Sequence, residues 1–155
     1  MRLVDLLKPE CIQVQLEAST KRDAIDALVK LLCDGVGIEN RQELADAVWQ
    51  REMTRTTGIG HGVAIPHGRC QGCEHLSLAV AKPARPLEFG SIDGKPVDLI
   101  ILLASPPHQT GPHIEALATI SRMLGDPDCH GAIRKATTAQ EIYDLFAQNQ
   151  TQFAK

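Results

Sequence analysis

Aromatic residues are scarce in this chain of 155 residues: tryptophan, tyrosine and phenylalanine together make up 3% of it. Lysine and arginine total 16 against 19 aspartates and glutamates, so the formal net charge is −3. A general nucleic-acid binder needs a cationic surplus for the phosphates and aromatic rings that stack on the bases. The composition therefore argues against a nucleic-acid partner.

Long apolar runs are also absent. The longest, Leu99 to Ala104, suits a β-strand and is far too short to span a bilayer. The amino-terminal segment is short and is interrupted by Asp5 and Lys8, so we expect it not to be a secretory signal peptide. With 43% hydrophobic and 23% charged residues, the composition is that of a globular protein. We expect a cytoplasmic protein that is not inserted in a membrane, with residues 1–155 forming one domain.

The five cysteines are odd in number and lack the spacing of a disulfide framework. Two of them, Cys70 and Cys73, form a Cys-x-x-Cys pair, and together with His67 and His75 they place four candidate zinc ligands in one short segment. Structural zinc usually draws its second pair of ligands from a separate segment. We therefore expect two unpaired loop thiols, no metal and no other cofactor, with metal binding or oxidation of Cys70 and Cys73 as the alternatives.

Strand and helix patterns alternate along the chain. Strands are expected at 11–16, 63–65, 76–81 and 97–104, the last buried on both faces because it is almost entirely apolar. Helices are expected after the capping residues Thr20, Asn40 and Thr138, with a further helix whose first residue is Pro112. A short helical piece is expected around 132–135. This order favours an α/β fold, a mixed β-sheet flanked by helices.

The stretch from Gly58 to Arg69 organises the rest of the chain. Glycines lead into a short apolar run, Pro66 ends that run, and His67 follows at once. Proline fixes its own φ angle and restricts the residue before it, so the imidazole is delivered to a strand end in a defined direction. His61, six residues earlier, is expected to be an exposed loop residue or to tune that site.

A second histidine, His113, follows the buried strand 97–104 and stands near the start of a predicted helix. In open α/β sheets, ligand sites gather at strand ends, and a helix N-terminus favours an anion. An imidazole nitrogen is nucleophilic near neutral pH. His67 could therefore accept a phosphoryl group that His113 helps to bind. From the residues alone, the alternative is a binding module in which both histidines are structural.

The segments Gly58-Ile59-Gly60 and Val63-Ala64-Ile65-Pro66-His67-Gly68 resemble the signature of phosphotransferase-system (PTS) IIA proteins of the mannitol/fructose/nitrogen-regulatory class. The resemblance runs from about Leu3 to Phe146. It implies the IIA (mannitol/fructose type) fold and one PTS IIA type-2 domain over residues 1–155.

The resemblance also implies roles for three residues. His67 corresponds to the histidine that is phosphorylated by an HPr-type carrier protein. His113, in His-Ile-Glu-Ala-Leu, corresponds to the family's second histidine and would stabilise the phosphoryl group. Arg51, in an Arg-Glu pair, corresponds to an arginine close to the active histidine and would balance charge or contact the partner. A simple helix-end cation is the other interpretation of Arg51.

Three segments are more similar to the nitrogen-regulatory branch: 6–12, 57–60 and 109–110. That branch implies a phosphocarrier and regulator, an enzyme only as a phosphohistidine phosphotransferase component. Its targets, such as sensor kinases or potassium transport systems, respond to its phosphorylation state. The alternative is a sugar-specific (fructose or mannitol) IIA component that passes phosphate to a IIB domain. A small metal-binding or non-catalytic binding module is the third possibility.

Overall fold

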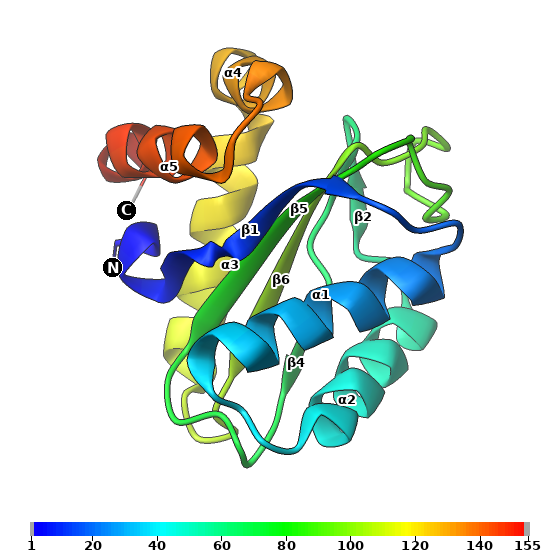
Figure 1. Cartoon of the computed structure of the whole chain (residues 1–155), viewed down its shortest axis with the longest axis vertical. Coiled ribbons are helices and arrows are strands. Elements are labelled where there is room, and N and C mark those ends of the chain that lie inside the picture. The colour runs from blue at the N-terminus through cyan, green and yellow to red at the C-terminus, as the bar shows by residue number, and fades with distance from the viewer. Residues whose placement is uncertain (1, 154–155) are drawn as a thin grey trace.

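The computed structural model describes residues 2–153, and within them a six-stranded mixed sheet lies between two helices on one face and three on the other (Figure 1). The strands follow the order β1 (Leu7–Leu16), β5 (Ser77–Pro83), β6 (Leu99–Ser105), β3 (Val63–Ala64) and β2 (Gly58–Gly60), and β4 (His67–Arg69) also pairs with β6. The β1–β5, β3–β6 and β4–β6 pairs are parallel, whereas β5–β6 and β2–β3 are antiparallel.

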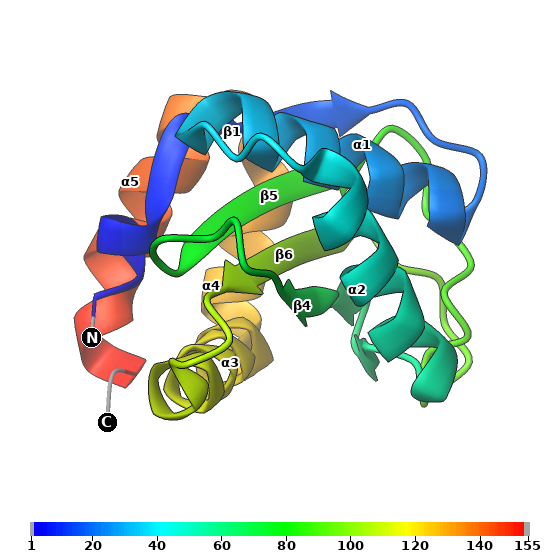
Figure 2. The ribbon, with the colours of Figure 1, turned by 90° about the horizontal axis from the view of Figure 1, so that it is seen from below.

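Helices α1 (Lys21–Val36) and α2 (Arg41–Thr54) cover the first face (Figure 2). Both begin where the sequence predicts. The Thr20 hydroxyl and the Asn40 side-chain oxygen each accept a hydrogen bond at 3.1 Å from the amide three residues further on, which satisfies a free helix-end amide. The apolar side of α1 packs into a core cluster beneath the sheet and includes the fully buried Ile25, Leu28 and Leu32.

Helices α3 (Thr110–Gly125), α4 (Pro127–Lys135) and α5 (Ala139–Phe153) lie on the opposite face, and a one-turn 3-10 helix, η1 (Leu3–Leu6), precedes β1. The buried Ile120, Met123 and Phe146 belong to a second core cluster on this side. The helix α4 is longer than the piece predicted at 132–135, because the Asp126 carboxylate caps it by accepting from the Cys129 amide at 3.1 Å. Among residues 2–153, no helix has the length and apolar character needed to cross a bilayer.

Strand β6 joins the two cores. Ile100, Leu102 and Ala104 belong to the first cluster, whereas Leu99, Ile101 and Leu103 belong to the second. Side chains alternate between the faces of a strand, so a strand covered on both sides must be apolar at every position. The prediction of a strand buried on both faces is confirmed.

The structure corrects the prediction that His67 ends a strand. The strand β3 stops at Ala64, and His67 instead begins β4, where it pairs with Leu103 of β6. Pro66 causes the interruption, because it has no amide to donate; its carbonyl still accepts from the Leu103 amide at 3.0 Å.

The helix that carries His113 begins earlier than predicted. Thr110 is its first residue, and Pro112 is the third. The His113 amide donates to the Gln109 carbonyl at 3.0 Å, so His113 lies in the first turn of α3 with its own amide already paired. What His113 offers to a ligand is therefore its side chain.

Candidate functional site

His67 and His113, far apart in the sequence, face one another in the structure. Their ring centroids lie 5.3 Å apart, and the ring planes are inclined by 67°. His67 is half-buried, whereas His113 is only 4% exposed. The two imidazoles come from adjacent elements, because β4 pairs with β6 and α3 begins shortly after β6 ends.

The hydrogen bond of His67 determines which of its nitrogens is free. Its Nδ1 lies 2.8 Å from the Ile65 carbonyl oxygen, which can only accept, so Nδ1 carries the hydrogen and Nε2 holds the lone pair. Burial lowers the pKa of His67, and the positive charges of Arg51 and Arg69 lower it further. His67 is therefore neutral and nucleophilic at Nε2 near neutral pH.

His113 is held by Ser105, the last residue of β6. The Ser105 hydroxyl is hydrogen-bonded to Nδ1 of His113, and both residues are buried. Burial lowers the pKa of His113 to about 4, and the charge of Arg69 and the charge that His67 carries when protonated act in the same direction. The ring is therefore neutral at physiological pH, with its orientation set through Nδ1.

Arg51 lies in the last turn of α2, and its Nη1 donates to the Arg55 carbonyl oxygen at 2.8 Å. This bond is the helix-end contact that a cation makes at a helix C-terminus. Arg51 is nevertheless close enough for its charge to lower the pKa of His67. The structure thus places Arg51 near His67, while its hydrogen bond goes to the residue that ends its own helix.

Arg69 is a residue of this candidate site that the sequence analysis did not identify. It lies two positions after His67 on β4, so the strand period places both side chains on one face. Its Nη1 donates to the Thr110 hydroxyl at 3.2 Å, at the start of α3. Its charge lowers the pKa of both His67 and His113.

A close backbone approach brings α2 to this site. A Cβ on Gly68 would lie 2.9 Å from the Val48 amide nitrogen and 2.9 Å from Val48 Cγ2. Only glycine leaves room for α2 to pack directly on β4, and Arg51 lies one turn further along the helix from that contact. Gly68 is therefore a packing requirement of the site.

The neighbour of Arg51 anchors the end of α2. Glu52 is 4% exposed, forms an ion pair with Lys21 at 2.8 Å, and accepts from the Thr57 amide at 3.0 Å. These contacts tie α2 to α1 and to the segment just before β2. The negative charge of Glu52 also raises the pKa of His67, against the two arginines.

His61 lies at the other end of β6 from His67. It is an exposed loop residue with φ 57°, its amide donates to Asp93 at 2.9 Å, and its carbonyl accepts from Arg134 at 2.9 Å. The next residue, Gly62, accepts from the amide of Leu99, where β6 begins. The structure therefore does not bring His61 to the histidine pair.

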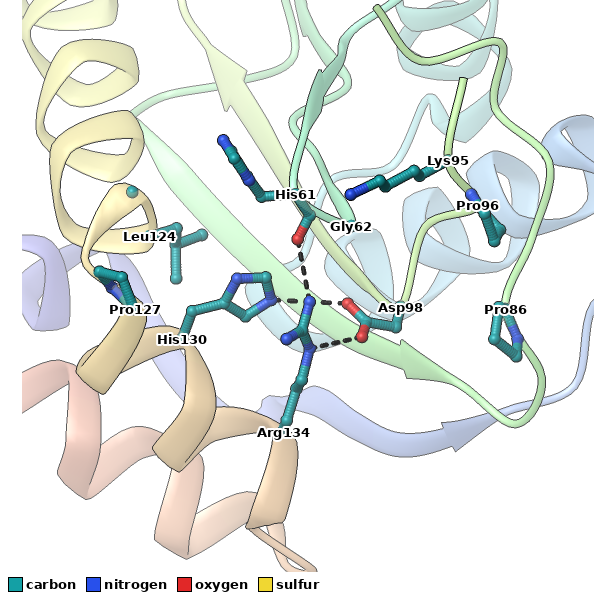
Figure 3. Close-up of a pocket in the computed structure, with 11 residues that line it drawn as sticks. His61, Gly62, Pro86, Lys95, Pro96, Asp98, Leu124, Pro127, His130 and Arg134 are labelled. Atoms are coloured by element: carbon teal, nitrogen blue, oxygen red, sulfur yellow. Dashed lines mark hydrogen bonds and ion pairs between the residues drawn. The ribbon is translucent and has the colours of Figure 1, made fainter. Parts of the chain in front are cut away.

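A pocket of about 500 Å³ opens beside His61 (Figure 3). In its lining, the Asp98 carboxylate accepts from Arg134 Nε at 2.5 Å, while its other oxygen lies 3.5 Å from Nε2 of the buried His130 and forms no hydrogen bond with it. The Asp98–Arg134 ion pair attaches α4 to the residue just before β6, and the two charges offset one another. This cluster lies apart from the two facing imidazoles.

The Cys-x-x-Cys pair follows β4 directly. Cys70 and Cys73 are buried, with their sulfur atoms 2.9 Å apart. Within residues 2–153, no third histidine, cysteine, aspartate or glutamate joins them in a group that could hold a metal ion. The four-ligand arrangement considered for His67, Cys70, Cys73 and His75 is therefore not formed.

Comparison with known proteins shows the family to which the chain belongs. Residues 5–149 match the family described as "Phosphoenolpyruvate-dependent sugar phosphotransferase system, EIIA 2". The chain is 37% identical over 147 residues to a nitrogen regulatory protein of Bradyrhizobium diazoefficiens, with 95% of each chain covered. It is also 30% identical to the fructose-specific PTS EIIA component of Haloferax volcanii, with 90% of each covered.

The solved structures agree with the fold. The crystal structure of the nitrogen regulatory protein IIA-Ntr from Neisseria meningitidis matches with a TM-score of 0.85 at 26% identity, covering 92% of this chain and 97% of that one. The expected α/β fold with a mixed sheet flanked by helices is thereby confirmed. The family match over residues 5–149 includes the strand that carries His67, the helix that carries His113 and the sheet between them. The chain belongs to the EIIA 2 family of the phosphoenolpyruvate-dependent sugar phosphotransferase system.

Proposed function

We propose that this protein is a phosphocarrier in which Nε2 of His67 accepts a phosphoryl group from the phosphohistidine of an HPr-type carrier protein. The observation that carries the proposal is the state of His67: Nδ1 is engaged by the Ile65 carbonyl, and Nε2 is free and unprotonated beside a second, neutral imidazole. A nucleophile needs this combination of a fixed ring and an available lone pair.

The transfer requires no proton movement at His67. The Nε2 lone pair forms the new N–P bond while the P–N bond of the donor breaks, and the electron pair of that bond returns to the donor imidazole. Nδ1 keeps its hydrogen and its bond to Ile65 throughout. Such a transfer depends mainly on positioning and on stabilisation of the phosphoryl charge.

His113 and the arginines supply that stabilisation. With the Ser105 hydroxyl donating to Nδ1 of His113, Nε2 of His113 carries a hydrogen and can donate it to a phosphoryl oxygen. Arg69 and Arg51 offset the negative charge that accumulates on His67. Arg51 has the larger effect of the two on His67, whereas the charge of Arg69 acts on both imidazoles and Arg69 also bonds to the first turn of α3.

The regulatory branch of the family is the favoured assignment. The relative named a nitrogen regulatory protein is 37% identical over 95% of both chains, against 30% for the fructose-specific relative. On this proposal the protein acts in the cytoplasm and binds targets such as sensor kinases or potassium transport systems according to its phosphorylation state. The fructose-specific relative supports the second candidate, a sugar-specific IIA that passes phosphate to a IIB domain.

The acceptor is tested by intact mass after incubation with phosphoenolpyruvate, the first PTS enzyme and an HPr-type carrier. We expect a gain of one phosphoryl group that is labile in acid and stable in base. The gain should vanish in His67→Ala and persist in His75→Ala, which removes an exposed histidine. No gain on the native chain would refute the phosphocarrier function, and a gain in His67→Ala would place the acceptor elsewhere.

The branch is tested by adding the phosphorylated protein to a fructose-specific IIB protein. A regulatory protein should keep its phosphoryl group over the time in which a sugar-specific IIA, run in parallel, transfers its own. Rapid transfer to the IIB protein would assign this chain to the sugar-specific branch instead.

A further inference from the structure

Cys70 and Cys73 have no part in the transfer mechanism, yet they are arranged for chemistry of their own. Their sulfur atoms are 2.9 Å apart, and each residue is 3% exposed. The pair lies in the turn that follows β4, immediately after Arg69. Two thiols that meet in this way need only a small further approach, under about 1 Å, to reach the length of an S–S bond.

The turn that holds the thiols is fixed by one bond within it and two from α2. The Cys73 amide donates to the Cys70 carbonyl at 3.2 Å, which closes the turn. The Glu43 carboxylate, on the first turn of α2, accepts from the Gln71 amide at 2.7 Å and from the Gly72 amide at 3.4 Å. The two sulfur atoms are therefore held together by the fold, so little conformational freedom remains to be lost when they bond.

We propose that Cys70 and Cys73 form a reversible intramolecular disulfide, and that this modification slows phosphorylation of His67. The first part stands on the geometry of the turn alone. The second part rests on the proposed phosphocarrier function.

The oxidation balances with a small-molecule disulfide such as glutathione disulfide as the oxidant. The Cys73 thiolate attacks one sulfur of the oxidant and releases one glutathione thiolate, which leaves a mixed disulfide on Cys73. The Cys70 thiolate then attacks the Cys73 sulfur and releases the second glutathione. Two protein thiols are oxidised, one glutathione disulfide is reduced to two thiols, and the protons of the protein thiols pass to the glutathione thiolates.

Cys73 is the residue that the oxidant reaches first. It lines a surface cavity of about 140 Å³ together with Gly72 and Glu74. Burial and the neighbouring Cys70 raise the pKa of Cys73, so the thiolate fraction near neutral pH is small. We therefore expect a slow reaction, and equilibration with the oxidant is followed over hours.

The disulfide would act on the histidine pair through the backbone. The Cys70 amide donates to the Ser105 carbonyl at 3.1 Å, and the Ser105 hydroxyl holds His113 through Nδ1. Cys70 also follows Arg69 directly, and Arg69 contacts the first turn of α3. Movement of Cys70 toward Cys73 would shift Ser105, which holds His113, and Arg69, whose charge acts on both imidazoles, and so would lower the rate of a reaction that depends on their alignment.

Peptide mapping of the native chain tests the disulfide. The full-length protein is equilibrated with glutathione disulfide or with reduced glutathione, quenched with acid, alkylated under denaturing conditions, and digested. Cleavage after Arg69 and Arg122 gives a peptide that contains Cys70 and Cys73 and none of the other cysteines. We expect this peptide to lose two hydrogens and to escape alkylation after oxidation, with recovery on reduction. Cys11, Cys33 and Cys129 should be alkylated in both samples.

Three variants test which cysteines form the bond. Cys70→Ser should stop at the mixed disulfide of Cys73 with glutathione, and Cys73→Ser should form no internal bond, whereas the matched control Cys33→Ser should still form it. Cys33 is the control because its thiol is near enough to raise the pKa of Cys73. A bond between Cys33 and either partner, or full alkylation of the 70–122 peptide after oxidation, would overturn the proposal. The map of the native chain decides this even where a variant fails to fold.

The effect on the site is measured as the initial rate of phosphoryl transfer from the carrier to the oxidised and the reduced native protein. We expect the oxidised form to be slower by roughly threefold or more, since the supporting contacts of a site typically matter at that scale or above. Equal rates would refute the effect on His67 and leave the disulfide standing. Absence of phosphorylation in the reduced protein would count against the phosphocarrier function, independently of the peptide map.

Discussion

Arg69 donates a hydrogen bond from Nη1 to the Thr110 hydroxyl at 3.2 Å, and this bond joins the strand that begins with His67 to the helix turn that includes His113. The charge of Arg69 lowers the pKa of both histidines, whereas that of Arg51 acts on His67. Arg69 therefore combines a structural link between the two elements with an electrostatic effect on both imidazoles.

Removing the charge of Arg69 should slow phosphoryl transfer more than removing that of Arg51. We expect Arg69→Gln to lower the initial rate by about tenfold, below the loss seen when a fully enclosed charge-stabilising donor is removed. Arg69→Lys should be intermediate, since it keeps the charge and loses the planar donor group. Transfer from a saturating phosphorylated carrier is the measurement. A larger loss in Arg51→Gln than in Arg69→Gln would reverse the assignment.

His113 should affect the rate of transfer without being essential to it. We expect His113→Ala to slow phosphorylation of His67 by about 100-fold, the scale of a lost charge-stabilising donor. Ser105→Ala, which leaves the ring in place without its partner at Nδ1, should cost about tenfold. Both variants need a check of folding by circular dichroism. Complete loss of labelling in a folded His113→Ala would show that His113 is essential for the transfer and does more than accelerate it.

The stability of the protein should fall as the pH drops below the ordinary pKa of histidine. The pKa of His113 is lowered to about 4 in the fold, so between that value and about 6.5 the unfolded chain binds a proton that the folded chain does not. The free energy of unfolding therefore rises with pH across this window, and His113 alone accounts for up to about 3 kcal/mol of the change.

Urea unfolding at several pH values between 4 and 7 measures this effect. His113→Gln should flatten the dependence, because glutamine does not titrate, whereas His75→Gln, at an exposed position, should leave it as it is. A native-like slope in His113→Gln would contradict the buried, neutral state of the ring.

Gly68→Ala should destabilise the fold and disturb the site together. Its Cβ would meet the Val48 amide nitrogen at 2.9 Å, and backbone atoms cannot move aside as a flexible side chain can. We expect a loss of about 1–3 kcal/mol in the free energy of unfolding, the usual cost of overpacking. Gly72→Ala is the matched control, since its Cβ would meet only Ile38 Cγ2 at 3.8 Å. Equal effects of the two substitutions would argue against the close approach of α2 to β4.

Local signals were sufficient for much of the fold. The caps at Thr20, Asn40 and Thr138 set the starts of three helices, because a side-chain oxygen satisfies a free amide whatever the tertiary context. Proline located the start of a helix less accurately. Pro112 is compatible with the first turn of a helix at more than one position, and α3 begins two residues before it.

The supporting residues of the site could not be found in the same way. Arg69 and Ser105 acquire their place from the register of β4 on β6, in which they are paired. Glu52 acquires its place from contact with α1. These relationships are long-range, so they have no periodic or spacing signal. Only the strand period linking His67 to Arg69 could have indicated the second arginine.

On the proposed mechanism, Nε2 of His67 receives the phosphoryl group while Nδ1 stays bound to the Ile65 carbonyl. Heteronuclear NMR of the phosphorylated protein, with ¹⁵N-labelled histidine, tests it directly. We expect one phosphohistidine, assigned to His67 through its loss in His67→Ala, with phosphorus on Nε2 and hydrogen on Nδ1. Phosphorus on Nδ1 of His67, or on any other histidine, would contradict it.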